Sequence, residues 1–322
     1  MKLEIYNEII SIIREYDGAK VCPWREVDSI LKQRFPDVSA DTLGSIYSLE
    51  YQKKMKKNHQ KFSKTGEKLY KKYQKEADSG EKPGILLRLA DSIDLSPALL
   101  ARIILEQHQE QGSDEEEVCF PTIHHNRLQL PVQIRIVCSA QQILWNCSPQ
   151  DHKLPSASKN TITKLMRDTT LIKNKDLAYE VYLCVIHDDQ YGPVTDCIKH
   201  SIGQEYELRL QRMVRNANIP FKDEEQLRTC GYDKTPDVKL ELPMAVDGFV
   251  VNWIESKALF GDEANHKTYI KEQYLSYWNR FGPGLVIYWL GFVDTLEYIS
   301  EKRFIIRDTF PNNITLMDPK SI

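Results

Sequence analysis

A β-hairpin is predicted by the sequence TPDVKLELPMAVDGFVVNWIESK at residues 235–257. Apolar residues alternate with polar ones on both sides of Asp247 and Gly248, where a tight turn would join two antiparallel strands. In the second strand, residues two apart share a face, so Glu255 and Lys257 point the same way. Counting back from the turn brings Asp237 opposite this pair. The sequence therefore predicts two carboxylates and one ammonium at a single point of a sheet.

This group of charges suits the metal-assisted hydrolysis of a phosphodiester. Two neighbouring carboxylates stay ionised most easily when a divalent cation lies between them, and their hard oxygen atoms favour Mg²⁺ or Mn²⁺. The cation polarises a phosphodiester oxygen and lowers the pKa of a water, while a lysine ammonium orients that water or stabilises transition-state charge. The alternative is a surface salt bridge. The apolar strand around Trp253 favours the metal site, because unpaired buried carboxylates are costly.

The order of these residues resembles the PD-(D/E)xK nucleases, which have the restriction-endonuclease-like fold. The TPD triplet precedes ESK in the predicted order helix, strand, strand, strand, helix, strand. Gly203 and Glu207 form GxxxE, which we expect at the start of the helix before the hairpin. Gln273 and Tyr277 form QxxxY, a pattern of the RecB-type branch, in a helix that we expect to end at Gly282.

The resemblance implies a catalytic role for each charged residue of the pattern. Asp237 and Glu255 would be the ligands of Mg²⁺ or Mn²⁺. Lys257 would orient water or stabilise charge, and Glu207 would supply a further ligand or a base, with nearby Glu205 as its rival.

Two roles are open for some of the other residues. Gln273 and Tyr277 would contact a phosphate, with core packing as the alternative for Tyr277. Asp262, in the sequence FGDE, would line the site or cap the next helix.

Longer stretches resemble a family of nucleases that interact with codanin. These stretches are GYDKTPD, WIESK, FGDE, SYWNRFGPGLVIYW and YGPVTDCIKH, and the likeness covers residues 25–110 and 155 nearly to the end. The resemblance implies codanin as a partner, a nuclear and cytoplasmic location, and a role in erythroid differentiation linked to congenital dyserythropoietic anaemia. Three interpretations stay open: a nuclease acting on DNA or RNA, a non-catalytic scaffold that keeps the nuclease fold for binding codanin, and a helix-turn-helix nucleic-acid binder.

The composition is typical of a soluble globular protein with roughly two domains. Of the 322 residues, 41% are hydrophobic and 28% are charged, and no apolar run is long enough to span a bilayer. The N-terminal segment mixes acids among apolar residues, which is unlike a signal peptide. The seven cysteines are scattered and form no CxxC pair, so the sequence indicates neither a disulfide framework nor a zinc ribbon, and it favours the nucleus or cytosol.

A lysine-rich segment predicts a phosphate-contacting patch. Residues 51–75 hold ten lysines and one acid, Glu67. The alternative is an ordinary solvated helix face, and KKMKK at 53–57 also fits a nuclear import signal. The residues predicted to contact nucleic acid are Lys53, Lys54, Lys56, Lys57, Lys71 and Lys72.

The sequence predicts a helical region over residues 1–110, a linker or insertion over 111–155, and a nuclease-like domain over 156–322 with a mixed β-sheet flanked by helices. Within the helical region, Ser39 and Ser96 are expected N-caps. The two helices around Ser96 would form a helix-turn-helix or an ordinary helical hairpin. Segment 113–153, in which residues 128–150 carry Arg135 as their only charge, is expected to be removable without loss of folding.

Overall fold

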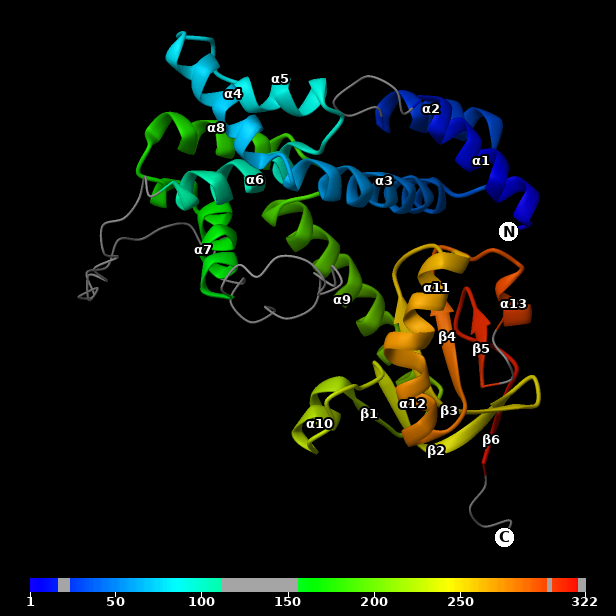
Figure 1. Ribbon diagram of the computed structural model, residues 1–322. Coiled ribbons are helices and arrows are strands. Elements are labelled where there is room, and N and C mark those ends of the chain that lie inside the picture. The colour runs from blue at the N-terminus through cyan, green and yellow to red at the C-terminus, as the bar shows by residue number, and fades with distance from the viewer. Residues whose placement is uncertain (17–23, 112–155, 300–302, 318–322) are drawn as a thin grey trace. The chain divides into compact units, whose positions relative to one another are not determined.

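The computed structural model describes residues 1–16, 24–111, 156–299 and 303–317, and it divides into two compact units (Figure 1). One unit comprises Met1–Lys54 and Ile198–Ile322 and is called the sheet unit; the other, Met55–Cys197, is called the helical unit. Helices occupy the N-terminal part of the chain and a mixed sheet the C-terminal part, so the expected α+β class is confirmed. The expected insertion at 113–153 lies outside the described residues.

The sheet unit contains the N-terminal helices and all the strands. Its elements are α1 (Leu3–Tyr16), α2 (Trp24–Arg34), the first part of α3 (Ala40–Ser63), most of α9 (Pro193–Asn216), β1 (Phe221–Asp223), α10 (Glu224–Thr229), β2 (Val238–Val246), β3 (Phe249–Lys257), α11 (Glu263–Tyr269), the π-helical turn η3 (Ile270–Tyr274), α12 (Leu275–Phe281), β4 (Gly284–Tyr288), α13 (Leu296–Ile299), β5 (Phe304–Arg307) and β6 (Ile314–Leu316). The helical unit contains α4 (Gly66–Asp78), α5 (Ile85–Ser92), α6 (Pro97–Glu110), α7 (Ser156–Arg167), η2 (Thr169–Leu171) and α8 (Lys175–Ile186).

The predicted hairpin is confirmed at the centre of the sheet. The strand order of the sheet is β1-β2-β3-β4-β5, and β6 pairs with β2. Strand β3 is antiparallel to β2 and parallel to β4. Val246 pairs with Phe249 around Asp247 and Gly248, whose φ values of 50° and 82° are those of a tight hairpin turn. The carboxyl ends of β3 and β4 therefore meet at one edge of the sheet.

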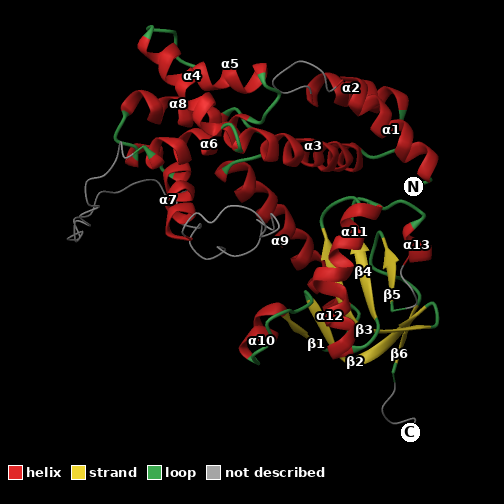
Figure 2. Cartoon of the chain, in the orientation of Figure 1, coloured by secondary structure: helices red, strands yellow, loops and turns green. Residues whose placement is uncertain are grey.

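Helices cover both faces of this sheet (Figure 2). On one face, Leu210 and Val214 of α9 pack with buried residues of β2, β3 and β4. On the other face, Tyr274 and Tyr277 pack around Trp253 of β3, which is fully buried. The helix containing Tyr277 ends at Phe281, and Gly282 follows with a φ of 83°, as its sequence predicts.

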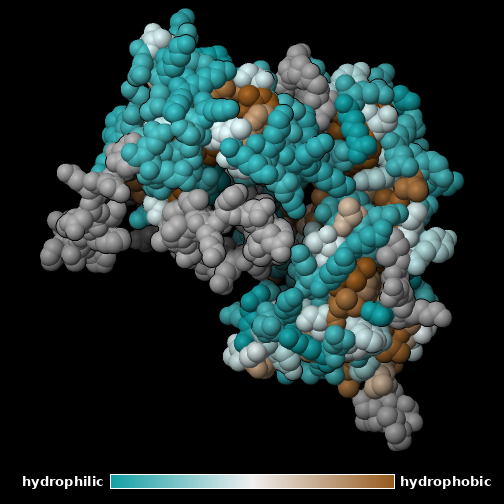
Figure 3. Space-filling model, viewed as in Figure 1, coloured by the Kyte–Doolittle hydropathy of each residue, from teal (hydrophilic) through white to brown (hydrophobic). Residues whose placement is uncertain are grey.

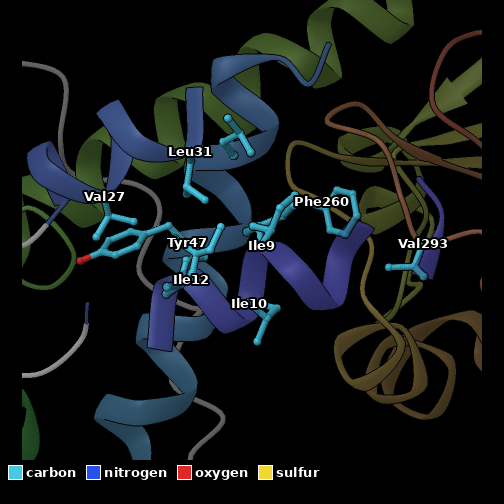
Figure 4. Packing of buried hydrophobic residues seen from close by; sticks show 11 residues of the cluster. Ile9, Ile10, Ile12, Val27, Leu31, Tyr47, Phe260 and Val293 are labelled. Atoms are coloured by element: carbon cyan, nitrogen blue, oxygen red, sulfur yellow. The ribbon is translucent and has the colours of Figure 1, made fainter. Parts of the chain in front are cut away.

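The N-terminal helices share a core with the loops of the sheet unit (Figure 4). Ile9 of α1, Leu31 of α2 and Tyr47 of α3 pack with Phe260, which follows β3, and with Val293. The Ser39 hydroxyl accepts a hydrogen bond from Thr42 N (3.1 Å), as expected of an N-cap. The described helices α1, α2 and α3 confirm the helical character expected of this part of the chain, and their apolar residues pack on loops that follow β3 and β4 within the same unit.

In the helical unit, carboxylates from the α8 region cap the two helices on either side of Ser96. Glu180 accepts hydrogen bonds from Gly84 N (2.7 Å) and Leu86 N (2.9 Å) at the start of α5. Asp188 accepts one from Ala98 N (3.0 Å) at the start of α6 and also binds the Ser96 hydroxyl. Ser96 occupies the N-cap position, but its side chain makes no capping bond, because Asp188 supplies the acceptor.

Burial of α6 favours the helical-hairpin alternative over a DNA-reading helix-turn-helix. Most residues of α6 are buried, including Leu100, Ala101 and Leu105. The helix packs on α4, α5 and α8. A recognition helix instead needs an exposed face that can enter a groove.

One expected helix boundary is wrong. Gly203 lies in the middle of α9, which begins at Pro193, so GxxxE does not mark the start of that helix. The Cβ of an alanine at Gly203 would meet no heavy atom within 4 Å, and the helix passes through this position unbroken.

The visible face of the molecule is mostly hydrophilic (Figure 3). Among the described residues, no helix has the length and apolar character needed to cross a bilayer.

Candidate active site

The hairpin brings Asp237 and Glu255 together at the carboxyl end of β3. Val238 pairs with Ile254, which sets the preceding Asp237 against Glu255 on the neighbouring strand. The carboxylate of Asp237 accepts a hydrogen bond from Ser256 N (2.7 Å), immediately beyond Glu255. Glu255 is 3% exposed and Asp237 is half-buried. The predicted approach of these two carboxylates is therefore present.

Lys257 completes the predicted trio and is fixed from three sides. Its Nζ lies 2.7 Å from Glu255 Oε1 and donates to Gln273 Oε1 at 3.0 Å. The same ammonium lies 4.8 Å from the ring centroid of Tyr269. Only 14% of the Lys257 side chain is exposed, so its position is set by these contacts rather than by solvent.

Electrostatics link the trio to Glu207 of α9. Burial raises the pKa of the Glu207 carboxyl to about 7, and the negative charges of Glu224 and Glu255 add to the rise. Lys257 acts in the opposite direction on the same carboxyl. Glu207 thus belongs to the same charge cluster, as its place in the sequence pattern predicts, whereas Glu205 is exposed.

Burial and mutual charge shift the pKa values of all three groups in the trio. Burial, and then the charges of Glu255 and Glu207, raise the pKa of Asp237 well above its usual range. Burial also raises the pKa of Glu255, although Lys257 partly offsets the rise. For Lys257, burial would lower the pKa, but attraction to Glu255 and Asp237 outweighs burial and raises it. Lys257 is therefore a firmly protonated ammonium among carboxylates that resist ionisation.

The donor atoms fit a hard divalent cation that keeps part of its water shell. The second carboxylate oxygen of Glu255, Oε2, is buried and has no hydrogen-bond partner among the described residues. No group of three or more histidine, cysteine or acidic side chains in the described ranges is arranged as a complete metal cage. Mg²⁺ is commonly held by one or two carboxylates plus waters and substrate phosphates, so Asp237 and Glu255 would be a sufficient protein ligand set.

Gln273 and Tyr277 have different surroundings. Gln273 lies in the π-helical turn η3 and accepts the hydrogen bond from Lys257, so it contacts the site through that ammonium. Tyr277 is 3% exposed, and its ring meets the Trp253 ring edge-on at 5.3 Å. Core packing, the alternative stated for Tyr277, is therefore its structural role. Phosphate contact by either residue stays a prediction.

Two roles are expected for Asp262. Asp262 caps α11, since its Oδ1 accepts from Asn265 N at 2.8 Å, and its Oδ2 lies 3.2 Å from Lys53 Nζ. Helix capping, one of the two roles expected for Asp262, is thus confirmed.

The lysines of the predicted patch lie on α3 and α4. Lys71 pairs with Glu67 at 2.6 Å and Lys72 with Glu76 at 4.0 Å, both one turn away on the same helix. These pairs support the alternative of a solvated helix face for α4. The six residues fall in both units, with Lys53 and Lys54 in the sheet unit and Lys56, Lys57, Lys71 and Lys72 in the helical unit, and nucleic-acid contact by them stays a prediction.

Sequence reasoning missed two members of the site. Glu224, the first residue of α10, raises the pKa values of both Glu207 and Glu255 by charge repulsion, after burial. Tyr269 supplies the ring beside Lys257. Neither residue belongs to the sequence pattern. The acidic segment FKDEEQ at residues 221–226, which precedes TPD and contains Glu224, was the signal that could have indicated a further carboxylate.

A buried histidine next to the site predicts a pH dependence of stability. His266 of α11 is fully buried, its Nδ1 lies 2.8 Å from the Tyr288 hydroxyl, and burial lowers its pKa to about 4 despite the charge of Asp262. Between pH 6.5 and 4 the unfolded state binds this proton and the folded state does not, so stability falls as the pH drops through that window. From pH 7 to pH 5 the loss is about 2 kcal/mol.

Urea unfolding at the two pH values checks this expectation. His266→Phe should lose about 2 kcal/mol less than the wild type between pH 7 and pH 5, whatever its stability at pH 7. Equal losses in the two proteins would show that His266 does not stay neutral in the folded state.

Comparison with known proteins identifies close relatives. A family model described as "Protein of unknown function TPD sequence-motif" matches residues 173–310. Proteins named CDAN1-interacting nuclease 1 match from Xenopus laevis, at 42% identity over 97% of this chain and 89% of the relative, and from Homo sapiens, at 40% identity over 94% and 96%. The Gallus gallus protein of that name is 36% identical over 97% of this chain and 95% of its own length. No solved structure matches.

Proposed function

Because this chain belongs to the family of the CDAN1-interacting nuclease 1 proteins, we propose that it is a divalent-metal-dependent nuclease of the PD-(D/E)xK type that binds codanin. The observation that carries the proposal is the unpartnered, buried Oε2 of Glu255 beside Asp237 and a protonated Lys257. A buried carboxylate oxygen without a partner is costly in a site with no ligand, and coordination of a cation removes that cost.

Each residue of the cluster has a distinct role in phosphodiester hydrolysis. Asp237 and Glu255 would hold Mg²⁺ or Mn²⁺, which when bound polarises the phosphodiester and makes water more acidic. Lys257, held by Glu255 and Gln273, directs its ammonium at the negative charge that develops on phosphorus oxygens during attack. Glu207 serves as a further ligand or as the base that takes a proton from the attacking water.

Codanin is the partner that the family membership favours. The relatives are named for an interaction with CDAN1, and their similarity extends over nearly the whole length of this chain. From the resemblance given by the sequence, we also propose a role in erythroid differentiation and a nuclear and cytoplasmic location.

Cleavage of a labelled panel of single-stranded and duplex DNA and RNA tests the nuclease proposal. Wild-type protein should cleave the oligonucleotides in Mg²⁺ or Mn²⁺. Cleavage should stop when the metal is chelated, because Asp237 and Glu255 act in hydrolysis only by holding the metal. Asp237→Ala, purified in the same way, is the matched control. Cleavage at the wild-type rate by this variant would assign the activity to a contaminating nuclease and refute the proposal.

One observation favours a second candidate, a non-catalytic scaffold that keeps the fold to bind codanin. Lys257 occupies one oxygen of a predicted metal ligand, Glu255 Oε1, through an ion pair. This pair would stabilise the site without metal. Wild-type protein that binds codanin yet binds neither Mg²⁺ nor Mn²⁺ by calorimetry would support the scaffold.

A further inference from the structure

An arginine and two aromatic rings form a cluster of their own beside the carboxylates. The guanidinium of Arg209 lies 5.0 Å from the ring centroid of Trp289 and 5.9 Å from that of Tyr206. The two rings are 5.5 Å apart with an interplanar angle of 35°. Arg209 is exposed and the two aromatic side chains are half-buried, so the cluster is open to solvent on its arginine side.

Backbone contacts place this cluster at the same sheet edge as the active site. Trp289 is the first residue after β4, and its backbone N donates to the carbonyl of Lys257 (3.0 Å). Its indole Nε1 donates to the Ser256 hydroxyl (2.8 Å), and Ser256 lies between Glu255 and Lys257 in the chain. Tyr206 precedes Glu207 on α9. Trp289 is therefore fixed to the strand that carries Glu255 and Lys257, on the face to which Ser256 points, and Tyr206 is the chain neighbour of Glu207. The carboxyl ends of parallel strands are where ligands bind in open α/β sheets.

The packing of α9 does not need this cluster. Leu210 and Val214 on the same helix are fully buried in the core and already fix α9 on the sheet. Arg209 makes no ion pair with a carboxylate in the described part of the chain, and its contacts are the two rings. Aromatic rings and a guanidinium plane stack on nucleobases, and the positive charge of the guanidinium attracts a phosphate. A cluster of this kind can therefore bind both parts of a nucleotide.

We propose that Tyr206, Arg209 and Trp289 bind an unpaired nucleotide next to the scissile phosphodiester, which makes single-stranded or locally unpaired nucleic acid the substrate class; this rests on the proposed nuclease function. The base stacks on the exposed side of the cluster, and the Arg209 charge attracts the adjoining phosphate. That cation offsets the repulsion that Asp237, Glu255 and Glu207 exert on a polyanion. A fully paired duplex cannot present a base face to these rings.

Binding measured apart from cleavage tests this assignment. Fluorescence anisotropy compares a labelled single-stranded oligonucleotide with the duplex of the same sequence, in Ca²⁺ and again in EDTA. Arg209→Ala and Tyr206→Ala should weaken single-strand binding roughly tenfold or more and duplex binding much less. Tyr206→Phe keeps the ring and should bind like the wild type. Thermal melts confirm that each variant folds.

The matched control is a second arginine–tryptophan contact among the described residues of the sheet unit. Arg303 lies 4.9 Å from the Trp278 ring, and its carbonyl accepts from Gly284 N at the opposite, amino end of β4. Arg303→Ala should leave oligonucleotide binding unchanged. A loss in Arg303→Ala equal to that in Arg209→Ala would overturn the assignment, as would unchanged binding by Arg209→Ala or no binding by the wild type. An equal loss for duplex would refute the unpaired substrate.

Failure of the nuclease proposal gives a different pattern. Calorimetric Mg²⁺ or Mn²⁺ binding should be the same in the wild type and in Arg209→Ala, because the carboxylate ligands are intact. Wild-type protein that binds single strands through Arg209 but neither binds metal nor cleaves would refute the catalytic function and support the nucleotide site.

Discussion

Glu255→Gln is expected to reduce metal-dependent cleavage to background and to remove metal binding, while Lys257→Ala slows cleavage on the order of 100-fold and leaves metal binding largely intact. The difference follows from the chemistry of the two groups. Glu255 supplies the buried Oε2 that would bind the cation, and an amide is a poor ligand for a hard metal. Lysine is no ligand at all, so its loss removes only charge stabilisation in the transition state.

Glutamine is chosen at position 255 because it keeps an acceptor for Lys257. Glu255→Ala would leave that largely buried ammonium without its closest partner, and breaking a buried ion pair destabilises a fold by about 3–5 kcal/mol. Lys257→Ala breaks the same pair, so urea unfolding is measured together with metal titration by calorimetry and oligonucleotide cleavage on the wild type and both variants.

Controls separate the site from the rest of the molecule. Glu205→Ala removes an exposed carboxylate two residues from Glu207 and should cleave like the wild type, whereas Glu207→Ala should be slower. Codanin binding should survive both Glu255→Gln and Lys257→Ala if the partner docks away from the cluster. Equal residual cleavage in all proteins would exclude this site as the source of the activity, and loss of metal binding in Lys257→Ala would contradict the role given to the lysine.

Gly284→Ala is expected to destabilise the sheet unit by about 3 kcal/mol, near the upper end for overpacking of a core. A Cβ at this position in β4 would lie only 2.1 Å from Cε2 and 2.2 Å from Cδ2 of Trp253. The indole has little room to retreat: it is fully buried, its Nε1 donates to the Gly282 carbonyl at 2.8 Å, and Tyr277 packs edge-on against it. The backbone of β4 must shift instead, which strains its pairing with β3 and β5.

Gly203→Ala is the matched control for this substitution. Its Cβ would meet no heavy atom within 4 Å in the middle of α9, so alanine should raise stability by about 0.5–1 kcal/mol through its better helix propensity. Urea unfolding measures both variants. Gly284→Ala combined with Trp253→Phe should lose less than the two single changes predict, because the smaller ring makes room. Equal stability of Gly284→Ala and the wild type would mean that the strand and the indole separate readily.

The hairpin, its turn and the trio at its end could be predicted from the sequence. Period-two alternation, Asp247 and Gly248 at the reversal, and the position of Asp237 before the first strand depend only on neighbours along two adjacent segments. The same locality made the Ser39 cap and the end of α12 before Gly282 predictable.

The distant elements that complete each site could not be predicted from the sequence and are known from the packed fold. The apolar stripe of α1 does not indicate that Phe260 is the residue it packs against. The spacing of residues around α8 does not indicate that Glu180 and Asp188 cap two other helices. Three interactions of the site likewise join separate elements: the repulsion between Glu224 and Glu207, the hydrogen bond from Lys257 to Gln273, and the contact of Arg209 with the Trp289 ring. A pattern along the chain encodes which face of an element is apolar or charged, whereas the partner of that face is chosen by the packing of all elements at once.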